Sequence, residues 1–337
     1  MIYFTGDINL TDWDFNPGFG IGSRIEKGFN PFAHLERNDA DLWIGNFEGV
    51  ASKTTTSTGL ASKVFRVDPD ALRLLPHFNV YGFANNHAMQ HGAEAYENTI
   101  KSLESVGSLV FGTKERKSIA LCHKGKKFTL TGMCLRIDEF SDNPSYWYNP
   151  EYKEIEEEVA SLPSDAFKVL YVHWGNEYIN RPSSQQKKFA HWLIDAGFDL
   201  IIGMHPHVLQ GYEDYKGKRI YYSLGNFVFD TASEPCKYGA IVGLDLTSDE
   251  PVYTEQYVKI EDCSPRLIDK ADVPVQYTIE HLNECLKKED NSEGYHAEIS
   301  RGYTAYRKEN HKQILKDMVR HPGMAVGLIK DFIQRRF

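Results

Sequence analysis

Five short apolar segments, each followed directly by polar residues, constrain the fold of this 337-residue chain more than any other feature. They occupy residues 2–4, 41–45, 80–84, 169–172 and 200–202, and helices are predicted at 70–75, 93–106 and 184–196. Such alternation predicts an α/β protein whose mostly parallel or mixed sheet is covered on both faces. Because ligands gather at the carboxyl ends of strands in such folds, we expect the polar residues there to form the functional site.

The composition is that of an ordinary globular protein. Hydrophobic residues make up 41% of the chain and charged residues 25%, which excludes a disordered or collagen-like chain. The formal net charge of −9 argues against non-specific nucleic-acid binding, so no nucleic-acid partner is expected. No apolar run is long enough to span a membrane, and the N-terminus shows no secretion-signal pattern. With five cysteines and no C-x-x-C pair, the expected location is the reducing cytoplasm.

The residues at the five strand ends are of the types that bind metal ions. They are Asp7, Glu48, Asn86, His173 and the pair His205 and His207. Carboxylate, amide and imidazole groups suit Zn²⁺, Mn²⁺ or iron. A bridging carboxylate would let them hold two metals, an arrangement that supports in-line attack on phosphorus. We therefore predict one or two divalent transition metals as the cofactor. The alternatives are a turn carboxylate for Asp7 and a core histidine bonded to the backbone for His173.

His205-Pro206-His207 is the most specific local pattern, because it follows a buried strand and a glycine. Two histidines at this spacing point to one side only if the proline bends the chain. The segment Asn85-Asn86-His87 also follows a buried strand. There the Asn86 oxygen can bind a metal while His87 reaches the substrate; the alternative for His87 is a loop histidine bonded to the backbone.

Six motifs, in this order, resemble those of the CapA family, also called the poly-gamma-glutamate capsule biosynthesis proteins. The motifs are Gly6-Asp7, Asn46-Phe47-Glu48, Ala84-Asn85-Asn86-His87, His173-Trp174-Gly175-Asn176-Glu177-Tyr178, Gly203-Met204-His205-Pro206-His207-Val208-Leu209-Gln210 and Tyr222-Ser223-Leu224-Gly225-Asn226-Phe227-Val228-Phe229-Asp230. That family is similar to the calcineurin-like metallophosphoesterases. The resemblance therefore implies a calcineurin-like α/β fold of layered sheets covered by helices.

The same resemblance implies a role for individual residues. Asp7, Glu48 and His207 would hold one metal, and Glu48, Asn86, His173 and His205 the other, with Glu48 bridging. His87 would be the catalytic general acid. Asn46, Asn85, Glu177, Tyr178 and Asn226 are expected to contact substrate or to orient the ligands. Asn9 takes the metal-site position that is a histidine in the metallophosphoesterases, which weakens the first site, and Gln90 stands where the CapA pattern usually has aspartate.

The function implied by the resemblance is metal-dependent hydrolysis of phosphoesters in the biosynthesis of a bacterial capsule or exopolymer, either poly-gamma-glutamate-like or polysaccharide. The substrate would be an anionic small molecule or polymer. One alternative is a non-catalytic capsule-assembly factor with a structural metal site, working with membrane-associated polymer synthesis machinery. Another is an amide-bond hydrolase or transferase acting on glutamyl polymers. A peripheral position at the inner face of the membrane is the alternative to a free cytoplasmic location.

The C-terminal part is expected to form a basic helical extension. Residues 1–260 would form the CapA-like metallophosphoesterase-type domain and residues 261–337 the extension. Residues 301–337 contain nine Lys or Arg and three Asp or Glu. Apolar residues within 314–319 and 328–333 predict two short helices separated by His321-Pro322-Gly323. These helices would pack on the domain or on a second subunit, forming an oligomer, or they would bind anionic lipid.

Overall fold

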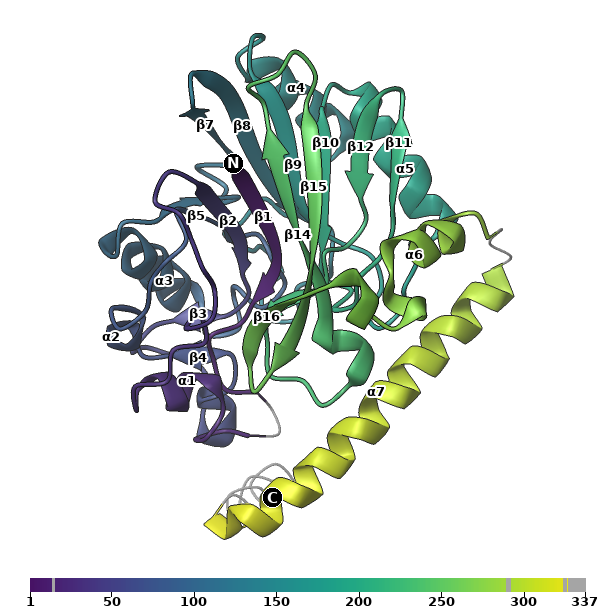
Figure 1. Ribbon diagram of the computed structural model, residues 1–337. Coiled ribbons are helices and arrows are strands. Elements are labelled where there is room, and N and C mark those ends of the chain that lie inside the picture. The colour runs from purple at the N-terminus through teal and green to yellow at the C-terminus, as the bar shows by residue number, and fades with distance from the viewer. Residues whose placement is uncertain (14–15, 289–291, 324–325, 327–337) are drawn as a thin grey trace.

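The computed structural model describes residues 1–13, 16–288, 292–323 and 326. Within these residues, two large β-sheets pack face to face and helices cover their outer faces (Figure 1). The layered α/β arrangement and the helical C-terminal segment expected from the sequence are confirmed. No described helix is long and apolar enough to cross a membrane.

The first sheet has the strand order β16-β15-β14-β1-β2-β5-β6, and β13 pairs with β1 beside this path. Its strands are β1 (Ile2–Ile8), β2 (Leu42–Phe47), β5 (Val80–Gly82), β6 (Leu109–Phe111), β13 (Asn226–Val228), β14 (Tyr238–Asp245), β15 (Val252–Glu261) and β16 (Ser264–Ile268). β1, β2, β5 and β6 are parallel, whereas β14, β15 and β16 form antiparallel pairs. The carboxyl ends of the parallel strands therefore lie at the same end of the sheet.

The second sheet has the strand order β11-β12-β10-β9-β8-β7. Its strands are β7 (Ser118–His123), β8 (Lys126–Cys134), β9 (Phe167–His173), β10 (Leu200–Met204), β11 (Tyr212–Tyr215) and β12 (Lys218–Tyr221). β8, β9, β10 and β12 are parallel, and the hairpins β7–β8 and β11–β12 form its two edges. A separate pair joins β3 (Val50–Ala51) to β4 (Arg66–Val67).

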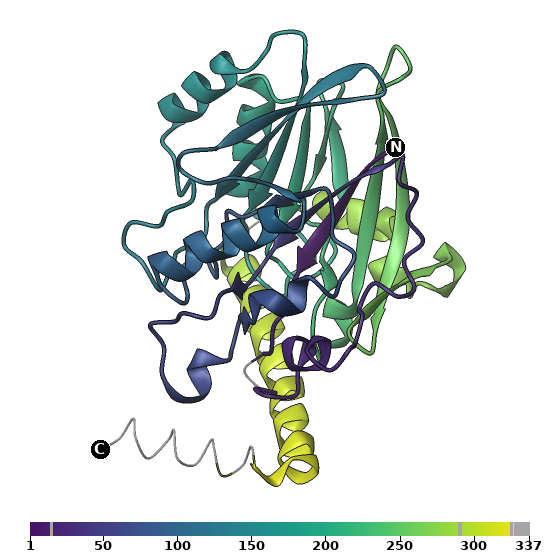
Figure 2. The ribbon, with the colours of Figure 1, turned by 90° about the vertical axis from the view of Figure 1, so that its left-hand side faces the viewer.

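Helices lie on the outer faces of both sheets. The helices are α1 (Ile21–Ile25), α2 (Pro69–Leu72), α3 (Ala93–Ser105), α4 (Tyr152–Ser161), α5 (Ser184–Asp195), α6 (Ile279–Leu286) and α7 (Ser292–Arg320), with short 3₁₀ turns at Gly59–Ser62, Glu234–Lys237, Lys270–Asp272 and Val275–Tyr277. Helices α1, α2 and α3 pack beside the first sheet (Figure 2), and α4 and α5 pack on the second. Two helix starts follow sequence rules: Asp68 and Ser183 cap α2 and α5 by accepting backbone hydrogen bonds.

Apolar side chains fill the space between the two sheets. Phe4 and Ile44 of the first sheet pack in one cluster with Leu130, Val169 and Ile202 of the second. Burial of large apolar surface is the main favourable term in folding, so this cluster fixes the two sheets relative to each other. It thereby fixes the positions of the strand ends that carry the polar motifs.

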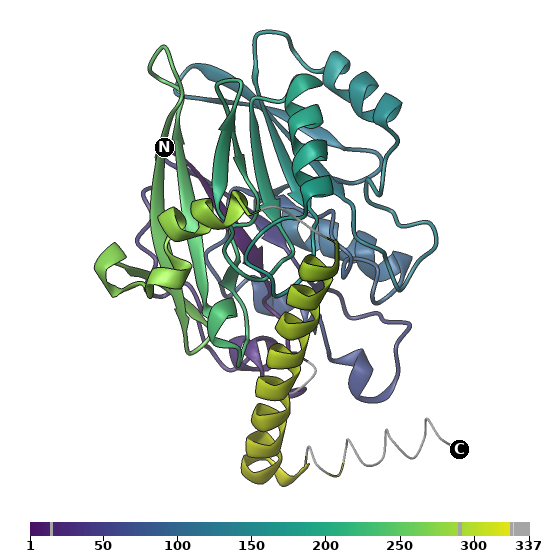
Figure 3. The same ribbon diagram turned by 90° about the vertical axis from the view of Figure 1, so that its right-hand side faces the viewer.

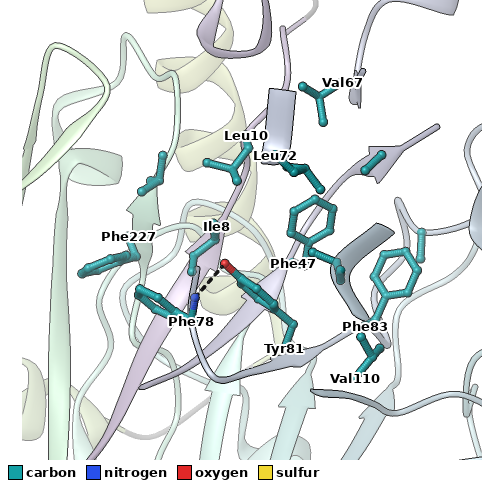
Figure 4. Close-up of a cluster of buried hydrophobic side chains, with 14 of the residues drawn as sticks. Ile8, Leu10, Phe47, Val67, Leu72, Phe78, Tyr81, Phe83, Val110 and Phe227 are labelled. Atoms are coloured by element: carbon teal, nitrogen blue, oxygen red, sulfur yellow. Dashed lines mark hydrogen bonds between the residues drawn. The ribbon is translucent and has the colours of Figure 1, made fainter. Parts of the chain in front are cut away.

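A second apolar cluster lies between the first sheet and its helices. Ile8, Phe47 and Tyr81 from three strands pack with Leu72 of α2, and Phe227 of β13 joins them (Figure 4). Asp7 directly precedes Ile8, and Glu48 directly follows Phe47. Packing on this outer face therefore anchors one side of the site.

Helix α7 is a single long helix that runs along one side of the molecule (Figure 3). Its lower end extends beyond the sheets. Residues 314–319, predicted as a separate short helix, are instead the last turns of α7, which ends before Pro322. The helix predicted around 328–333 lies outside the described residues. The predicted domain boundary at residue 260 falls in β15, which pairs with β16 in the same sheet, and this division stays a prediction.

Candidate metal centre

Strand ends from both sheets converge on one buried cluster of polar side chains. Asp7 lies in β1, Asn46 in β2 and His173 at the end of β9. β1 and β13 approach closely because Gly6 has no side chain: a Cβ there would lie 1.8 Å from the carbonyl oxygen of Gly225. The Asp7 amide donates a hydrogen bond to that same oxygen at 3.0 Å. This contact places the start of β13 beside the cluster.

Asp7 ties the two sheets together at the centre of the cluster. Its side chain is fully buried, and its Oδ1 accepts a hydrogen bond from Asn46 Nδ2 at 2.7 Å. Its Oδ2 accepts a hydrogen bond from the backbone N–H of His205 at 3.1 Å and lies 3.6 Å from His207 Nδ1. Burial raises the pKa of Asp7, against the lowering effect of His207 and these hydrogen bonds. The carboxylate thus joins β1 and β2 to the loop that follows β10.

Three histidines surround Asp7. His205 Nδ1 lies 3.1 Å from His173 Nε2, which in turn lies 2.9 Å from Asn86 Oδ1. His207 Nδ1 lies 2.9 Å from Asn226 Oδ1. Burial, and then the charge of neighbouring histidines, holds the pKa of His173 and of His205 well below the usual value. Both rings are therefore neutral, which is the form of imidazole that binds metals.

Glu48 is a fully buried carboxylate near Asp7 and His207. Among the described residues, no donor reaches either of its oxygens, and His205 Nε2 is likewise buried without a partner. Glu48 Oε1 lies 3.6 Å from His207 Nε2. Burial, and then the Asp7 carboxylate, raises the pKa of Glu48 well above the usual value. Burying a carboxylate without compensation is costly, so this arrangement fits a bound cation.

The candidate ligand atoms form two groups, each within 4.8 Å. One group is Glu177, His205 and His207, and the other is Asp7, Glu48 and His173. The resemblance instead placed His207 with Asp7 and Glu48. His207 Nε2 lies 3.6 Å from Glu48 Oε1, whereas the atom 3.6 Å from Asp7 Oδ2 is the other ring nitrogen, Nδ1. Carboxylate oxygens and imidazole nitrogens are the donors that Zn²⁺, Mn²⁺ and iron take. The residues fit one or two divalent metals, and the assignment of each ligand stays a prediction.

His87 lies at the edge of the cluster, with 17% of its side chain exposed. Its Nδ1 lies 2.9 Å from Gln90 Oε1, and its Nε2 lies 3.8 Å from Glu48 Oε1. Asn85 Oδ1 accepts a hydrogen bond from the His87 backbone at 3.2 Å, and Asn85 Nδ2 donates one to the carbonyl of Phe47 at 2.8 Å. Burial lowers the pKa of His87 to about 4. The ring is neutral in the metal-free protein and is placed between the cluster and solvent.

Asn9 lies next to the cluster but turns its oxygen toward its own loop. Asn9 Oδ1 accepts hydrogen bonds from the Thr11 backbone at 2.8 Å and from Thr11 Oγ1 at 2.6 Å. Among the described residues, no acceptor meets Asn9 Nδ2, which is buried. In this arrangement both lone pairs of the oxygen are used within the loop. A metal-binding role for Asn9 therefore stays a prediction.

The loops that carry the ligands contain unusual backbone conformations. His205, His207 and Tyr178 have φ angles of 93°, 57° and 62°, in the left-handed region that residues with a side chain seldom adopt. The two loops are joined by a hydrogen bond from the Tyr178 N–H to the carbonyl of Pro206 at 2.9 Å. Strain of this kind persists where surrounding structure holds it, and it gathers at functional sites.

Three aromatic residues at the site had no signal in the motifs. Phe65 stacks on the His87 ring, while Tyr303 and Tyr306 of α7 contact Glu177 and Tyr178. Glu177 Oε1 is 3.9 Å from His207 Nε2, and the expected contact of Glu177 and Tyr178 with substrate or ligands stays a prediction. Phe65, Tyr303 and Tyr306 lie far from the motifs in sequence, so no local pattern could place them.

Comparison with known proteins gives a consistent result. The family described as "Bacterial capsule synthesis protein PGA_cap" matches residues 1–231. A "Capsule biosynthesis protein CapA" of Bacillus anthracis is 31% identical, and the aligned region covers 72% of this chain and 60% of that protein. A "PGA biosynthesis protein CapA" of Bacillus subtilis is 29% identical over 61% of this chain and 58% of that protein. The chain thus spans about three fifths of the length of these relatives.

Among solved structures, a phosphatase of Mycoplasma pneumoniae is 13% identical, with a TM-score of 0.42. That match covers 80% of this chain and 90% of the other. The six motifs that carry the resemblance all lie within the 231 residues that the capsule-synthesis family matches. The site described above is therefore built within that region, except for its contacts with α7.

Proposed function

This chain belongs to the family of bacterial capsule synthesis proteins PGA_cap, and from that premise we propose that it is a metal-dependent hydrolase acting on phosphoesters. Its substrate would be an anionic small molecule or polymer used in making a capsule or a related extracellular polymer. The names of the two Bacillus relatives support this setting. The cytoplasmic location, contact with membrane-associated synthesis machinery and oligomer formation remain parts of the proposal.

The observation that carries the proposal is the buried Glu48 carboxylate. Among the described residues, neither of its oxygens meets a hydrogen-bond donor, and His205 Nε2 is buried without a partner nearby. In a polar cluster that binds no ion, the protein itself would be expected to supply hydrogen bonds to these groups. Their arrangement around Asp7 and His207 instead supports a cation as the common partner.

The chain's own residues would hold the metal. Asp7, Glu48, Asn86, His173, His205 and His207 would bind one or two divalent metals. A divalent metal bound there would supply Lewis-acid activation of water and of the phosphoryl oxygen. Asn46 and Asn226 orient Asp7 and His207 by hydrogen bonds at 2.7 and 2.9 Å. Such orienting partners fix ligand geometry and tune the metal.

His87 would donate a proton to the leaving group. Its Nδ1 lies 2.9 Å from the side-chain oxygen Oε1 of Gln90, so Nδ1 carries a hydrogen and Nε2 is the atom that takes up and delivers the proton. Its pKa of about 4 in the free protein is too low for a protonated ring at neutral pH. A phosphate anion beside Nε2 would favour the charged ring and raise this pKa. His87 would therefore become an acid only when substrate is bound.

The test combines metal analysis with an activity screen on the full chain. Metal-free protein would be reconstituted with Zn²⁺, Mn²⁺ or Fe²⁺, analysed for metal, and assayed on phosphomonoesters and phosphodiesters such as bis-nitrophenyl phosphate. We expect metal binding together with metal-dependent hydrolysis. Protein that takes up none of the three metals would overturn the proposal.

One observation favours a second function, an amide-bond hydrolase or transferase on glutamyl polymers. The oxygen of Asn9 is used by Thr11, which leaves the first metal position weaker than the pattern requires. A site whose residues hold one metal would still suit attack of water on a carbonyl but would hold a phosphoryl group less well. Release of glutamate from glutamyl amides with no phosphoester turnover would support this function. Tight metal binding with neither activity would support a non-catalytic assembly factor.

A further inference from the structure

We propose that Glu177 is a metal ligand of this centre, in the position that Asn9 leaves open, and that helix α7 holds it there through Tyr303. The inference rests on the proposed metal-dependent function and names a further ligand for the same site. It makes the C-terminal helix part of the metal centre. Three independent contacts carry it.

The first is the geometry around His207. Glu177 Oε1 lies 3.9 Å from His207 Nε2, and Glu48 Oε1 lies 3.6 Å from the same nitrogen. The other ring nitrogen, Nδ1, faces Asn226 Oδ1 at 2.9 Å, which leaves Nε2 for a metal. Oxygens of two carboxylates thus face one imidazole nitrogen. Two carboxylates repel each other in a buried site unless a cation lies between them.

The second is the environment of His205. Ligand atoms of Glu177, His205 and His207 all lie within 4.8 Å of one another. His205 is 2% exposed, and its Nδ1 faces His173. Its Nε2 is buried and has no partner in the described part of the chain. The unpartnered His205 nitrogen and the Glu177 carboxylate could both bind the same cation. A contact between Glu177 and substrate alone would leave this nitrogen without a partner.

The third is the way α7 fixes the direction of the carboxylate. The Tyr303 hydroxyl donates a hydrogen bond to Glu177 Oε2, so Oε1 is the oxygen that faces His207. Next to it, Tyr178 stacks on Tyr306 of α7 with ring centroids 3.8 Å apart. A half-buried carboxylate without this hydrogen bond would sample more rotamers. The hydrogen bond from α7 therefore orders the Glu177 side chain before a metal binds, which reduces the entropy lost on binding.

Two further contacts press α7 onto the Glu177 loop. A Cβ at Gly302 would lie 2.5 Å from the carbonyl oxygen of Tyr178, so only glycine allows the helix to come this close. Arg181, which is 4% exposed, donates two hydrogen bonds to Glu298 at 2.8 and 3.2 Å. Helix α7 begins at Ser292, well beyond residue 231 where the family match ends. The proposed ligand thus depends on a segment outside the matched region.

The test measures metal binding by the full chain, with Mn²⁺ and Co²⁺ as probes. Metal content after loading and removal of free metal is measured by elemental analysis, and the visible absorption of bound Co²⁺ reports its coordination. Glu177→Gln removes the charge and keeps the shape of the side chain. Asn9→Ala tests whether Asn9 is a ligand instead, and Tyr303→Phe removes the hydroxyl that positions Glu177. Glu293→Gln is the matched control, at an exposed carboxyl of α7.

We expect two metal equivalents in the wild type, in Asn9→Ala and in Glu293→Gln, and one in Glu177→Gln. The equivalent that remains shows that this variant is folded. Tyr303→Phe should keep both metals but bind the weaker one about 10-fold less tightly, as for loss of an orienting group. A changed Co²⁺ spectrum in Glu177→Gln is also expected.

Two equivalents with unchanged affinity and Co²⁺ spectrum in Glu177→Gln would overturn the inference and leave the proposed function standing. Loss of a metal in Asn9→Ala but not in Glu177→Gln would also overturn it and assign the ligand to Asn9. A wild type that binds no metal would overturn both proposals. Loss of one metal in Glu177→Gln, in a protein that hydrolyses no phosphoester, would support the inference and overturn only the proposed reaction.

Discussion

His87 lies flat against Phe65, with the ring centroids 3.7 Å apart and the ring planes at 4° to each other. Stacking on an apolar ring holds the imidazole in one orientation and shields one face from water. Burial of this kind explains why the pKa of His87 falls to about 4. The contact therefore sets both the direction of Nε2 and the energy needed to protonate it.

Replacing His87 by glutamine should lower turnover and leave the metal in place. Loss of a general acid costs about 10²–10⁴-fold in rate, whereas His87 Nε2 is 3.8 Å from Glu48 and lies at the edge of the ligand cluster. Steady-state kinetics on bis-nitrophenyl phosphate measure the turnover, and elemental analysis measures the metal content. His281→Gln, at an exposed histidine, is the control. Loss of metal from the His87 variant would show that His87 is a ligand.

Replacing Gln90 by aspartate should raise the pKa of His87. The amide oxygen of Gln90 accepts from Nδ1 at 2.9 Å, and a carboxylate there would favour the charged ring more strongly. Because a general acid works only when protonated, activity should then extend to higher pH. The pKa can be followed by NMR titration of the imidazole and the activity by a pH–rate profile. Gln90→Ala, which removes the acceptor, should not raise the pKa; an unchanged value in Gln90→Asp would contradict this prediction.

Replacing His205 and His207 together by glutamine should abolish metal binding. The resemblance assigns His207 to one metal and His205 to the other, so the double change would remove a nitrogen donor from each position. Elemental analysis after reconstitution measures the loss, and far-UV circular dichroism checks the fold. The exposed pair His281 and His296, changed in the same way, serves as the control. Full metal content in the His205/His207 variant would place the metal elsewhere.

The strands that carry the site could be located from the sequence because their signals are local. Each apolar strand is short, is bounded by polar residues and has a residue such as Asp7 or His173 at or near its carboxyl end. The alternation of strands and helices therefore predicts that these polar residues lie at the carboxyl ends of the strands. Packing between the sheets then brings these ends together without further information. The caps of α2 and α5 are equally local, because Asp68 and Ser183 are residue types favoured at helix starts.

The contacts of α7 with the site could not be read in this way. Tyr303 meets Glu177 only because α7 returns along the molecule, and that path depends on pairs such as Arg181 with Glu298 that have no sequence spacing in common. The loop torsion that turns the Asn9 oxygen toward Thr11 is likewise a detail of local geometry. A motif gives the residue type at a position but not the direction of its side chain.

Acidification should weaken metal binding. Burial raises the pKa of Glu48 well above the usual value and also raises that of Asp7, so in the metal-free protein these carboxyls hold protons to higher pH than exposed ones. A metal must displace those protons, so binding releases them and affinity rises with pH until both groups are ionised. Titration calorimetry in two buffers of different ionisation enthalpy counts the protons. Binding without proton release, at an affinity independent of pH, would contradict these pKa shifts.

Replacing Gly302 by alanine should loosen α7 and weaken the metal site. Alanine alone favours a helix over glycine by about 1 kcal/mol, but its Cβ would lie 2.5 Å from the Tyr178 carbonyl oxygen, a backbone atom that cannot turn aside. Overpacking of this kind costs about 1–3 kcal/mol, so the steric effect should outweigh helix propensity and lower the melting temperature. As α7 moves out, Tyr303 should lose its hold on Glu177 and metal affinity should fall. Gly323→Ala is the matched control, since a Cβ there meets no atom within 4 Å. A Gly302 variant with raised melting temperature and unchanged metal affinity would show that α7 does not hold the Glu177 loop in place.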